Sequence, residues 1–353
     1  MKRAISLALA IMLICCLFTG CGKNEGQAPD MNTEGLAVNE IVTGPINPLT
    51  GEKAEADNSA ARPYCVMINN HSQARPCKGL SNASIVYEAL VEGCITRMMA
   101  VFDDISDVDV GYIRSARPYY ISLVQSYDAI YVHCGGSSQA KSDIKQFGIS
   151  DIDATYGAAG SAWVRDPDRV GKVSYEHTLY AKGAKIAEYA KSNFATEHPA
   201  GFDTSYGLIF SPVADTQCTK ESKDFTIYYF GHKGGSNTST QLKYNDSKGC
   251  YNAYISGTEY TDGYNTSIDF ANVIILNVPT KTVDSKGHQE MNVVGSGSGY
   301  FCTGGKYVEI NWERASRNDN FHYTLTDGTP LALGVGKTFI SIAPLDSTDG
   351  VIW

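Results

Sequence analysis

The spacing of apolar residues changes near residue 200, and this change limits the possible folds more than any other feature of the chain. Before it, short apolar runs alternate with stretches of helical period, as at residues 129–132 followed by 139–147. After it, apolar runs are separated by Gly, Asn and Asp turns, which is typical of an all-β segment. We therefore expect an α+β protein, with a layered α/β N-terminal domain followed by a β-rich C-terminal domain.

The 353 residues exceed the usual size of one domain, so two domains are expected. We place the N-terminal domain at residues 61–200 and the C-terminal domain at residues 201–353. Residues 21–60 are rich in Asn, Gly, Glu, Pro and Asp and show little apolar periodicity. Such a composition predicts a flexible tether.

The first twenty residues have the layout of a secretory signal peptide. A positively charged start precedes an almost unbroken apolar run at residues 4–18, and two small residues then lead into Cys21. Because the run ends at a cysteine, it resembles a bacterial lipoprotein signal, in which Cys21 is lipidated and becomes the mature N-terminus. A transmembrane anchor is the alternative, but the run is shorter than the roughly 20 residues that a spanning helix needs. We expect attachment to the cell membrane on its extracytoplasmic face.

Several segments of the N-terminal half have a clear periodicity. Strands are expected at residues 62–68, 85–91, 95–102 and 129–132, and helices at residues 117–127, 139–147 and 178–192. The strands at 85–91 and 95–102 would form a hairpin that turns at Gly93, although a helix beginning at Ser84 is an alternative.

The C-terminal half carries further strand-like runs. They lie at residues 208–210, 225–230, 273–278, 307–312 and 338–342. Asp327-Gly328 is a hairpin signal. The glycines of residues 295–299 predict a loop between strands, because no helix and no Lys-Ser/Thr pair follows them.

Charge and cysteine content exclude several classes of partner. The net charge of −9 argues against a nucleic-acid partner on electrostatic grounds, and attachment to the lipid bilayer would depend on the lipid at Cys21. Seven cysteines follow Cys21, none of them in a CxxC pair or at metal-site spacing. We expect no metal site and no cofactor, and we treat these cysteines as buried apolar residues while leaving a disulfide open.

The arginines are concentrated in the N-terminal half. Seven of the ten lie between Arg62 and Arg169, where only three lysines occur. The guanidinium group offers a rigid fork of donors that matches a carboxylate or a phosphate. This half is therefore expected to hold anions, which would be either its own carboxylates, such as Glu88 and Glu92, or those of a ligand.

Two histidines lie where strands are expected to end. His71 follows the strand at residues 62–68, and His133 precedes a glycine pair that would let a ligand approach the backbone. Either could act as a general base. Cys134 would point to the opposite side of the strand from His133, so the sequence supports no Cys–His nucleophile there, and the catalytic residues stay unknown.

The motifs together resemble one family, the YerB-like lipoproteins built from the domain of unknown function DUF3048. They are Asn47-Pro48-Leu49-Thr50-Gly51, Val66-Met67-Ile68-Asn69-Asn70-His71, Ala74-Arg75-Pro76, Ile85-Val86-Tyr87-Glu88, Ile95-Thr96-Arg97, Arg114-Ser115-Ala116-Arg117-Pro118-Tyr119 and Ile130-Tyr131-Val132-His133. The resemblance implies a layered α+β first domain and a β-rich second domain. It supplies no established activity.

Two functions fit these observations. The first is a membrane-tethered protein that binds an anionic cell-wall fragment or an envelope protein in an Arg/His-rich cleft. Its expected binding residues are His71, Arg75, Glu92, Arg97, Arg114, Ser115, Arg117 and His133. The alternative is a peptidoglycan-directed hydrolase or transferase that uses His71 or His133 as its base.

Overall fold

The computed structural model describes residues 44–231, 237–344 and 350–353, which all belong to one compact unit. The expected signal peptide, the lipidated Cys21 and the first part of the tether lie outside the described residues. None of the helices in the described ranges is both long and apolar enough to cross a membrane.

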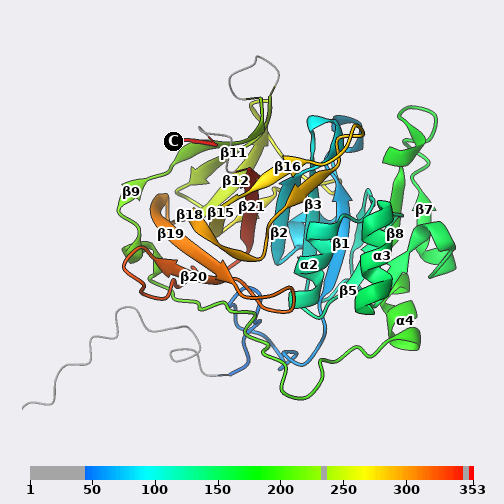
Figure 1. Ribbon diagram of the computed structural model, residues 1–353, viewed down its shortest axis with the longest axis horizontal. Helices are drawn as coiled ribbons and strands as arrows, with labels where there is room; N and C mark the ends of the chain where they lie inside the picture. Colours follow the sequence, from blue (N-terminus) through cyan, green and yellow to red (C-terminus); the bar gives the residue numbers. More distant parts are fainter. Residues whose placement is uncertain (1–43, 232–236, 345–349) are drawn as a thin grey trace, which may run out of the picture. The chain divides into compact units, whose positions relative to one another are not determined.

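An eleven-stranded sheet passes through both halves of the chain (Figure 1). Its order is β20-β19-β18-β15-β21-β2-β3-β1-β5-β6, and β9 pairs with β19 outside this path. The strands are β1 (Tyr64–Asn69), β2 (Ile85–Leu90), β3 (Thr96–Phe102), β5 (Ile130–His133), β6 (Asp151–Asp153), β9 (Lys220–Glu221), β15 (Asn272–Val278), β18 (Gly295–Thr303), β19 (Lys306–Arg314), β20 (His322–Leu325) and β21 (Thr338–Pro344). The expected α+β fold is confirmed, and the segments 61–200 and 201–353 share this sheet.

Strand β21 joins the two halves of the chain. It lies between β2 and β15 and runs parallel to both. Ile340 is the register partner of Tyr87 on one side and of Ile274 on the other. Every residue of β21 is buried, as is usual for a parallel strand that is covered on both faces.

Strands β2 and β3 form the predicted hairpin. They pair antiparallel from Ile85–Val101 to Leu90–Thr96, and the short helix η3 (Glu92–Cys94) makes the turn. Gly93 lies in the turn with φ of 72°, a left-handed conformation that glycine adopts without steric cost. The alternative helix from Ser84 is absent, since β2 occupies this segment.

Helices α2 (Pro118–Ser126) and α3 (Ser138–Phe147) contact each other beside the sheet (Figure 1). Both were predicted. Pro118 occupies the first turn of α2, where its missing N–H is not needed. The hydroxyl of Ser137 caps α3 by accepting a hydrogen bond from the Ala140 amide at 3.2 Å. Helix α2 also contacts β17 (Gln289–Met291), a strand from the C-terminal half.

Smaller sheets complete the fold. Their strands are β4 (Asp109–Gly111), β7 (Trp163–Arg165), β8 (Leu179–Lys182), β10 (Asp224–Phe230), β11 (Thr238–Asn245), β12 (Cys250–Ile255), β13 (Thr258–Glu259), β14 (Asp269–Phe270), β16 (Thr280–Thr282), β17 (Gln289–Met291) and β22 (Val351–Ile352). The sheet of β10–β14 and β22 contacts β2, β15 and β21 of the long sheet. Strands β16 and β17 form a separate hairpin.

Folded structure begins before residue 61, so the expected tether is too long. Leu49 and Thr50 are buried, and the Asn47 amide donates a hydrogen bond to the Asp103 carboxylate at 2.9 Å. Gly51 lies so close to Phe210 that a Cβ atom there would be 2.5 Å from its ring. Residues 44–60 carry too little apolar periodicity to predict that they are folded. Their packing partner Phe210 comes from a distant part of the chain, so local sequence does not reveal the contact.

One expected element in the middle of the chain is confirmed only in part, and another is wrong. The predicted helix at residues 178–192 begins with strand β8 and turns into helix α4 only at Gly183–Asn193. Strand β8 forms because it pairs with β4 and β7, which outweighs the local helical period. The predicted strand at residues 208–210 is reduced to one bridge between Phe210 and Leu333.

The glycine-rich segment 295–299 is a strand, not the predicted loop. It forms the first half of β18, between β15 and β19. A Cβ atom on Gly299 would lie 2.2 Å from the Ile275 carbonyl oxygen, and one on Gly297 would lie 2.7 Å from the Trp312 ring. The glycines are therefore needed for the close approach of neighbouring strands and side chains.

Substituting Gly299→Ala should lower the free energy of unfolding by about 1–3 kcal/mol, because the added methyl group overlaps the β15 backbone. Urea unfolding would measure the change. Ser296→Ala, at an exposed position of the same strand, should shift it by less than about 0.5 kcal/mol. Equal stabilities for the two variants would contradict the close approach.

Candidate ligand-binding site

Glu92, Arg97 and Arg117, here called the Glu92 cluster, lie together at the end of the β2–β3 hairpin. Arg117 precedes α2 and donates from Nε and Nη2 to the two carboxylate oxygens of Glu92, the second at 2.7 Å. Arg97 Nη2 lies 3.8 Å from the same carboxylate, and its Nη1 donates to the Ser115 carbonyl at 2.6 Å. Four of the expected binding residues are therefore neighbours.

The charges of this cluster perturb one another. Burial alone would raise the pKa of Glu92, but the hydrogen bonds and charge of Arg117, together with Arg97, bring it below its ordinary value. Burial, assisted by the charge of Arg117, lowers the pKa of Arg97 to about 10. One carboxylate thus serves two guanidinium groups, and the cluster keeps an excess of positive charge.

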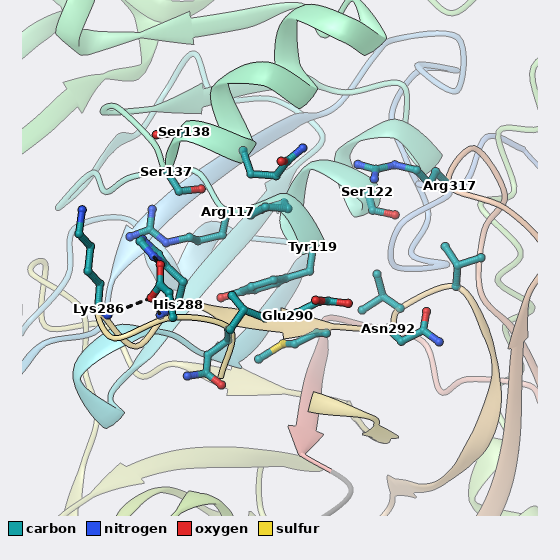
Figure 2. Close-up of a pocket in the computed structure, with 18 residues that line it drawn as sticks. Arg117, Tyr119, Ser122, Ser137, Ser138, Lys286, His288, Glu290, Asn292 and Arg317 are labelled. Atoms are coloured by element: carbon teal, nitrogen blue, oxygen red, sulfur yellow. Dashed lines mark hydrogen bonds and ion pairs between the residues drawn. The ribbon is translucent and has the colours of Figure 1, made fainter. Parts of the chain in front are cut away.

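A cavity of about 830 Å³ opens beside this cluster, within the usual range for small-ligand sites. We call it the α2–α3 cavity (Figure 2). Helices α2 and α3 form one side of it, and the segment that contains β17 forms the other. Its lining residues are Arg117, Pro118, Tyr119, Ser122, Ser137, Ser138, Gln139, Val283, Asp284, Lys286, His288, Gln289, Glu290, Met291, Asn292, Val293, Val294 and Arg317.

Most charges in the cavity wall already have a partner. His288 lies between two carboxylates, with Nδ1 at 2.6 Å from Asp284 and Nε2 at 3.4 Å from Glu92. Glu290 is paired with Lys281 at 3.3 Å. Among the described residues Lys286 forms no ion pair, so this lysine is a cation of the wall that contacts no carboxylate side chain.

Arg317 supplies a second cation, and a buried arginine holds it in place. The Arg314 side chain is fully buried and donates to the carbonyls of Ser122 at 2.5 Å and Arg317 at 2.7 Å. It thereby ties the loop after β19 to helix α2. Arg317 Nε donates to Gln125 at 2.9 Å, and Nη2 stays 3.6 Å from Asp143, beyond hydrogen-bond distance.

Sequence reasoning missed the segment 283–294, which forms one wall of the cavity. The Asp284 carboxylate accepts hydrogen bonds from the amides of Lys286 and His288, and Gly287 has a φ of 82°. Locally the segment is an ordinary polar turn. Nothing in its sequence shows that it lies against α2, because β15 and β18 place it there.

His71 and Arg114 lie in a different place from the cavity. The His71 ring stacks on His177 with 4.5 Å between centroids, and Arg114 pairs with Glu176 at 3.0 Å. Burial, followed by the nearby charge of His71, lowers the pKa of His177. Neither His71 nor Arg114 is among the cavity-lining residues.

His133 and Arg75 are used internally. His133 is 1% exposed, and its two ring nitrogens lie 2.9 Å from the Gly135 carbonyl and 3.1 Å from Asp151. Arg75 donates to the side chain and the carbonyl of Asn70, at 3.1 and 2.7 Å. The expected cleft that would unite all eight residues is therefore wrong, because only Arg117 lines the cavity and Glu92 reaches it through His288.

Other arginines of the N-terminal half brace the backbone. Arg62 donates to the carbonyls of Asp128 and Ala195 at 2.6 and 2.7 Å, and Arg165 donates to Tyr175 at 2.6 Å. A guanidinium group can satisfy several carbonyls at once. Arginine enrichment in this half thus reflects loop fixation more than ligand contact.

The chain is similar to known proteins over most of its length. Residues 49–197 match the "Protein of unknown function (DUF3048) N-terminal domain", and residues 230–340 match the corresponding C-terminal domain. A Bacillus subtilis (strain 168) protein named "Putative lipoprotein YerB" is 32% identical over 301 residues, which cover 84% of this chain and 86% of that protein. The crystal structure of YerB from Bacillus subtilis is similar with a TM-score of 0.73 and 27% identity, covering 87% of this chain and 98% of that one.

Substituting Glu92→Gln should lower the free energy of unfolding at pH 7 by about 1–3 kcal/mol, because two guanidinium groups lose their carboxylate. The folded-state pKa of Glu92 is depressed, so its contribution is present above the unfolded value of about 4.3. This stabilising contribution disappears as the pH falls through the folded-state pKa of Glu92.

Urea unfolding of both proteins between pH 7 and pH 3 would measure this difference. Glu290→Gln serves as the control, because its exposed pair with Lys281 contributes less than about 1 kcal/mol. A wild-type advantage that stays constant across this pH range would contradict a role for the Glu92 charge.

Proposed function

The chain belongs to the DUF3048 family, and from this we propose that it is a membrane-tethered envelope lipoprotein that binds an anionic ligand in the α2–α3 cavity. The observation that carries the proposal is a cation of the cavity wall that has no described carboxylate partner. Asp284 and Glu290 are paired with His288 and Lys281, whereas Lys286 has no described ion-pair partner. A negatively charged ligand would supply that partner.

The anchor supports a ligand from the cell envelope. Cys21 would carry the lipid, and a relative with 32% identity bears a lipoprotein name. A protein held there meets cell-wall fragments and envelope proteins rather than cytosolic metabolites. An acidic fragment of the wall or an acidic segment of an envelope protein would therefore be the ligand.

The hydrolase or transferase alternative has no comparable observation behind it. His133 is buried with both ring nitrogens occupied. His71 Nδ1 accepts a hydrogen bond from the Gln73 amide, and the ring is stacked on His177. A general base must reach the proton that it removes, and neither ring lines the described cavity.

Substituting Lys286→Glu should weaken the binding of soluble peptidoglycan fragments at least tenfold, because the unpaired cation of the cavity becomes an anion. Isothermal titration calorimetry with purified muropeptides would measure the dissociation constants. Lys172→Glu makes the same charge change at an exposed position outside the cavity and should leave binding unchanged. Equal affinities for wild type and both variants would refute the proposed site.

Substituting Cys21→Ala should move the protein from the membrane fraction to the soluble fraction and abolish labelling by a clickable palmitate analogue. The thioether-linked lipid needs the cysteine sulfur, so no other residue replaces it. Fractionation and in-gel fluorescence of cells that express either protein would show the difference. Unchanged labelling of the alanine variant would contradict the anchor.

A further inference from the structure

Two cations with unused N–H donors lie at opposite ends of the α2–α3 cavity: Lys286, which has no ion pair among the described residues, and Arg317, which pairs with Asp143 at 3.6 Å. Figure 2 shows Lys286 on one side of Tyr119 and Arg317 on the other. Resting on the proposed function, we infer that the ligand is a short acidic peptide with two separated carboxylates. One carboxylate binds at Lys286 and the other at Arg317, with uncharged peptide between them.

At the first end, Lys286 is the group that can contact the ligand directly. Arg117 is close by, but its Nε, Nη1 and Nη2 all donate to Glu92 or to the Ala116 carbonyl. Three of its five N–H groups are thereby used and its charge is paired with Glu92, which leaves Lys286 as the cation without a carboxylate partner. Lys286 lies on an exposed turn, and its ammonium group forms no ion pair or hydrogen bond within residues 44–231, 237–344 and 350–353. The Ser138 side chain lines the same end.

At the second end, Arg317 presents a guanidinium group that is held in position. Its Nε is bonded to Gln125, and the planar group lies 4.4 Å from the centre of the Phe147 ring. Among the described contacts, Nη1 takes part in no hydrogen bond. The side chain is 35% exposed, so this donor can face a ligand. A fixed guanidinium loses little freedom when it binds a carboxylate.

Between the two ends, Figure 2 shows Tyr119 and Glu290, and the Glu290 carboxylate is paired with Lys281 at 3.3 Å. The Tyr119 hydroxyl donates to the Leu90 carbonyl at 2.8 Å, and Pro118, Met291 and Val293 also line the cavity. A charged group placed here would lose water without gaining a partner. This favours a peptide with apolar residues between two carboxylates over a phosphodiester polymer, which carries a charge on every repeat.

Two synthetic probes test the inference with the full lipidated chain in detergent. The dicarboxylate Ac-Glu-Val-Ala and its monocarboxylate analogue Ac-Gln-Val-Ala differ in one charge only. Calorimetry should show at least tenfold tighter binding of the dicarboxylate. Lys286→Ala and Arg317→Ala should each remove this preference, whereas Lys172→Ala should keep it. If Arg317→Ala does not fold, Lys286→Ala, on its exposed turn, still decides the test.

The possible failures can be told apart. If muropeptides bind but the two peptides bind equally, the inference is overturned and the proposed function stands. If poly(glycerol phosphate) binds more tightly than the dicarboxylate, and this binding is lost in Lys286→Ala, the ligand is a phosphodiester polymer rather than a peptide. This outcome also overturns the inference. If neither muropeptides nor either peptide binds, the proposed function fails together with it.

Discussion

Strand β21 hydrogen-bonds in parallel to β2 on one side and to β15 on the other, so the two halves of the chain share one sheet. The contacts continue at the start of the strand, where the Thr338 amide donates to the Ser84 carbonyl at 3.0 Å and the Lys337 ammonium to Ser81 at 2.8 Å. Pairing of segments so distant in sequence requires a large loss of chain entropy. Burial of all residues of β21 offsets this loss.

The sheet also determines where the charges meet. The β2–β3 hairpin presents Glu92 at its turn, and Arg117 reaches it from the residue before α2. On the other side, strands that belong to the C-terminal half carry residues 283–294 to the same place, where His288 touches Glu92. Buried Arg314 completes the arrangement by fastening the Arg317 loop to α2. The cavity is thus a product of three chain segments that only the long sheet brings together.

Elements whose stability is local could be predicted from the sequence. The hairpin that turns at Gly93, helix α2 with Pro118 in its first turn, and helix α3 capped by Ser137 all follow from short-range rules. Elements that depend on a distant partner could not. Strand β8 overrides a helical period because it pairs with β4 and β7, and the glycines of β18 are needed for contacts with Ile275 and Trp312.

The features of the candidate site also separate into those that the sequence indicated and those that depend on distant parts of the chain. The sequence alone indicated the family, the α+β class, the expected anchor at Cys21 and an arginine-rich first half that must hold anions. Only the tertiary structure decided what the cations contact. Arg117 contacts Glu92, and Arg62 contacts Asp128 and backbone carbonyls, whereas Lys286 and Arg317 of the second half line a cavity. The physical reason is the distance along the chain over which each kind of information acts. Composition and periodicity report what each residue prefers within a few positions, whereas contacts such as His288 with Glu92 and Arg317 with Asp143 depend on segments that are far apart in the sequence.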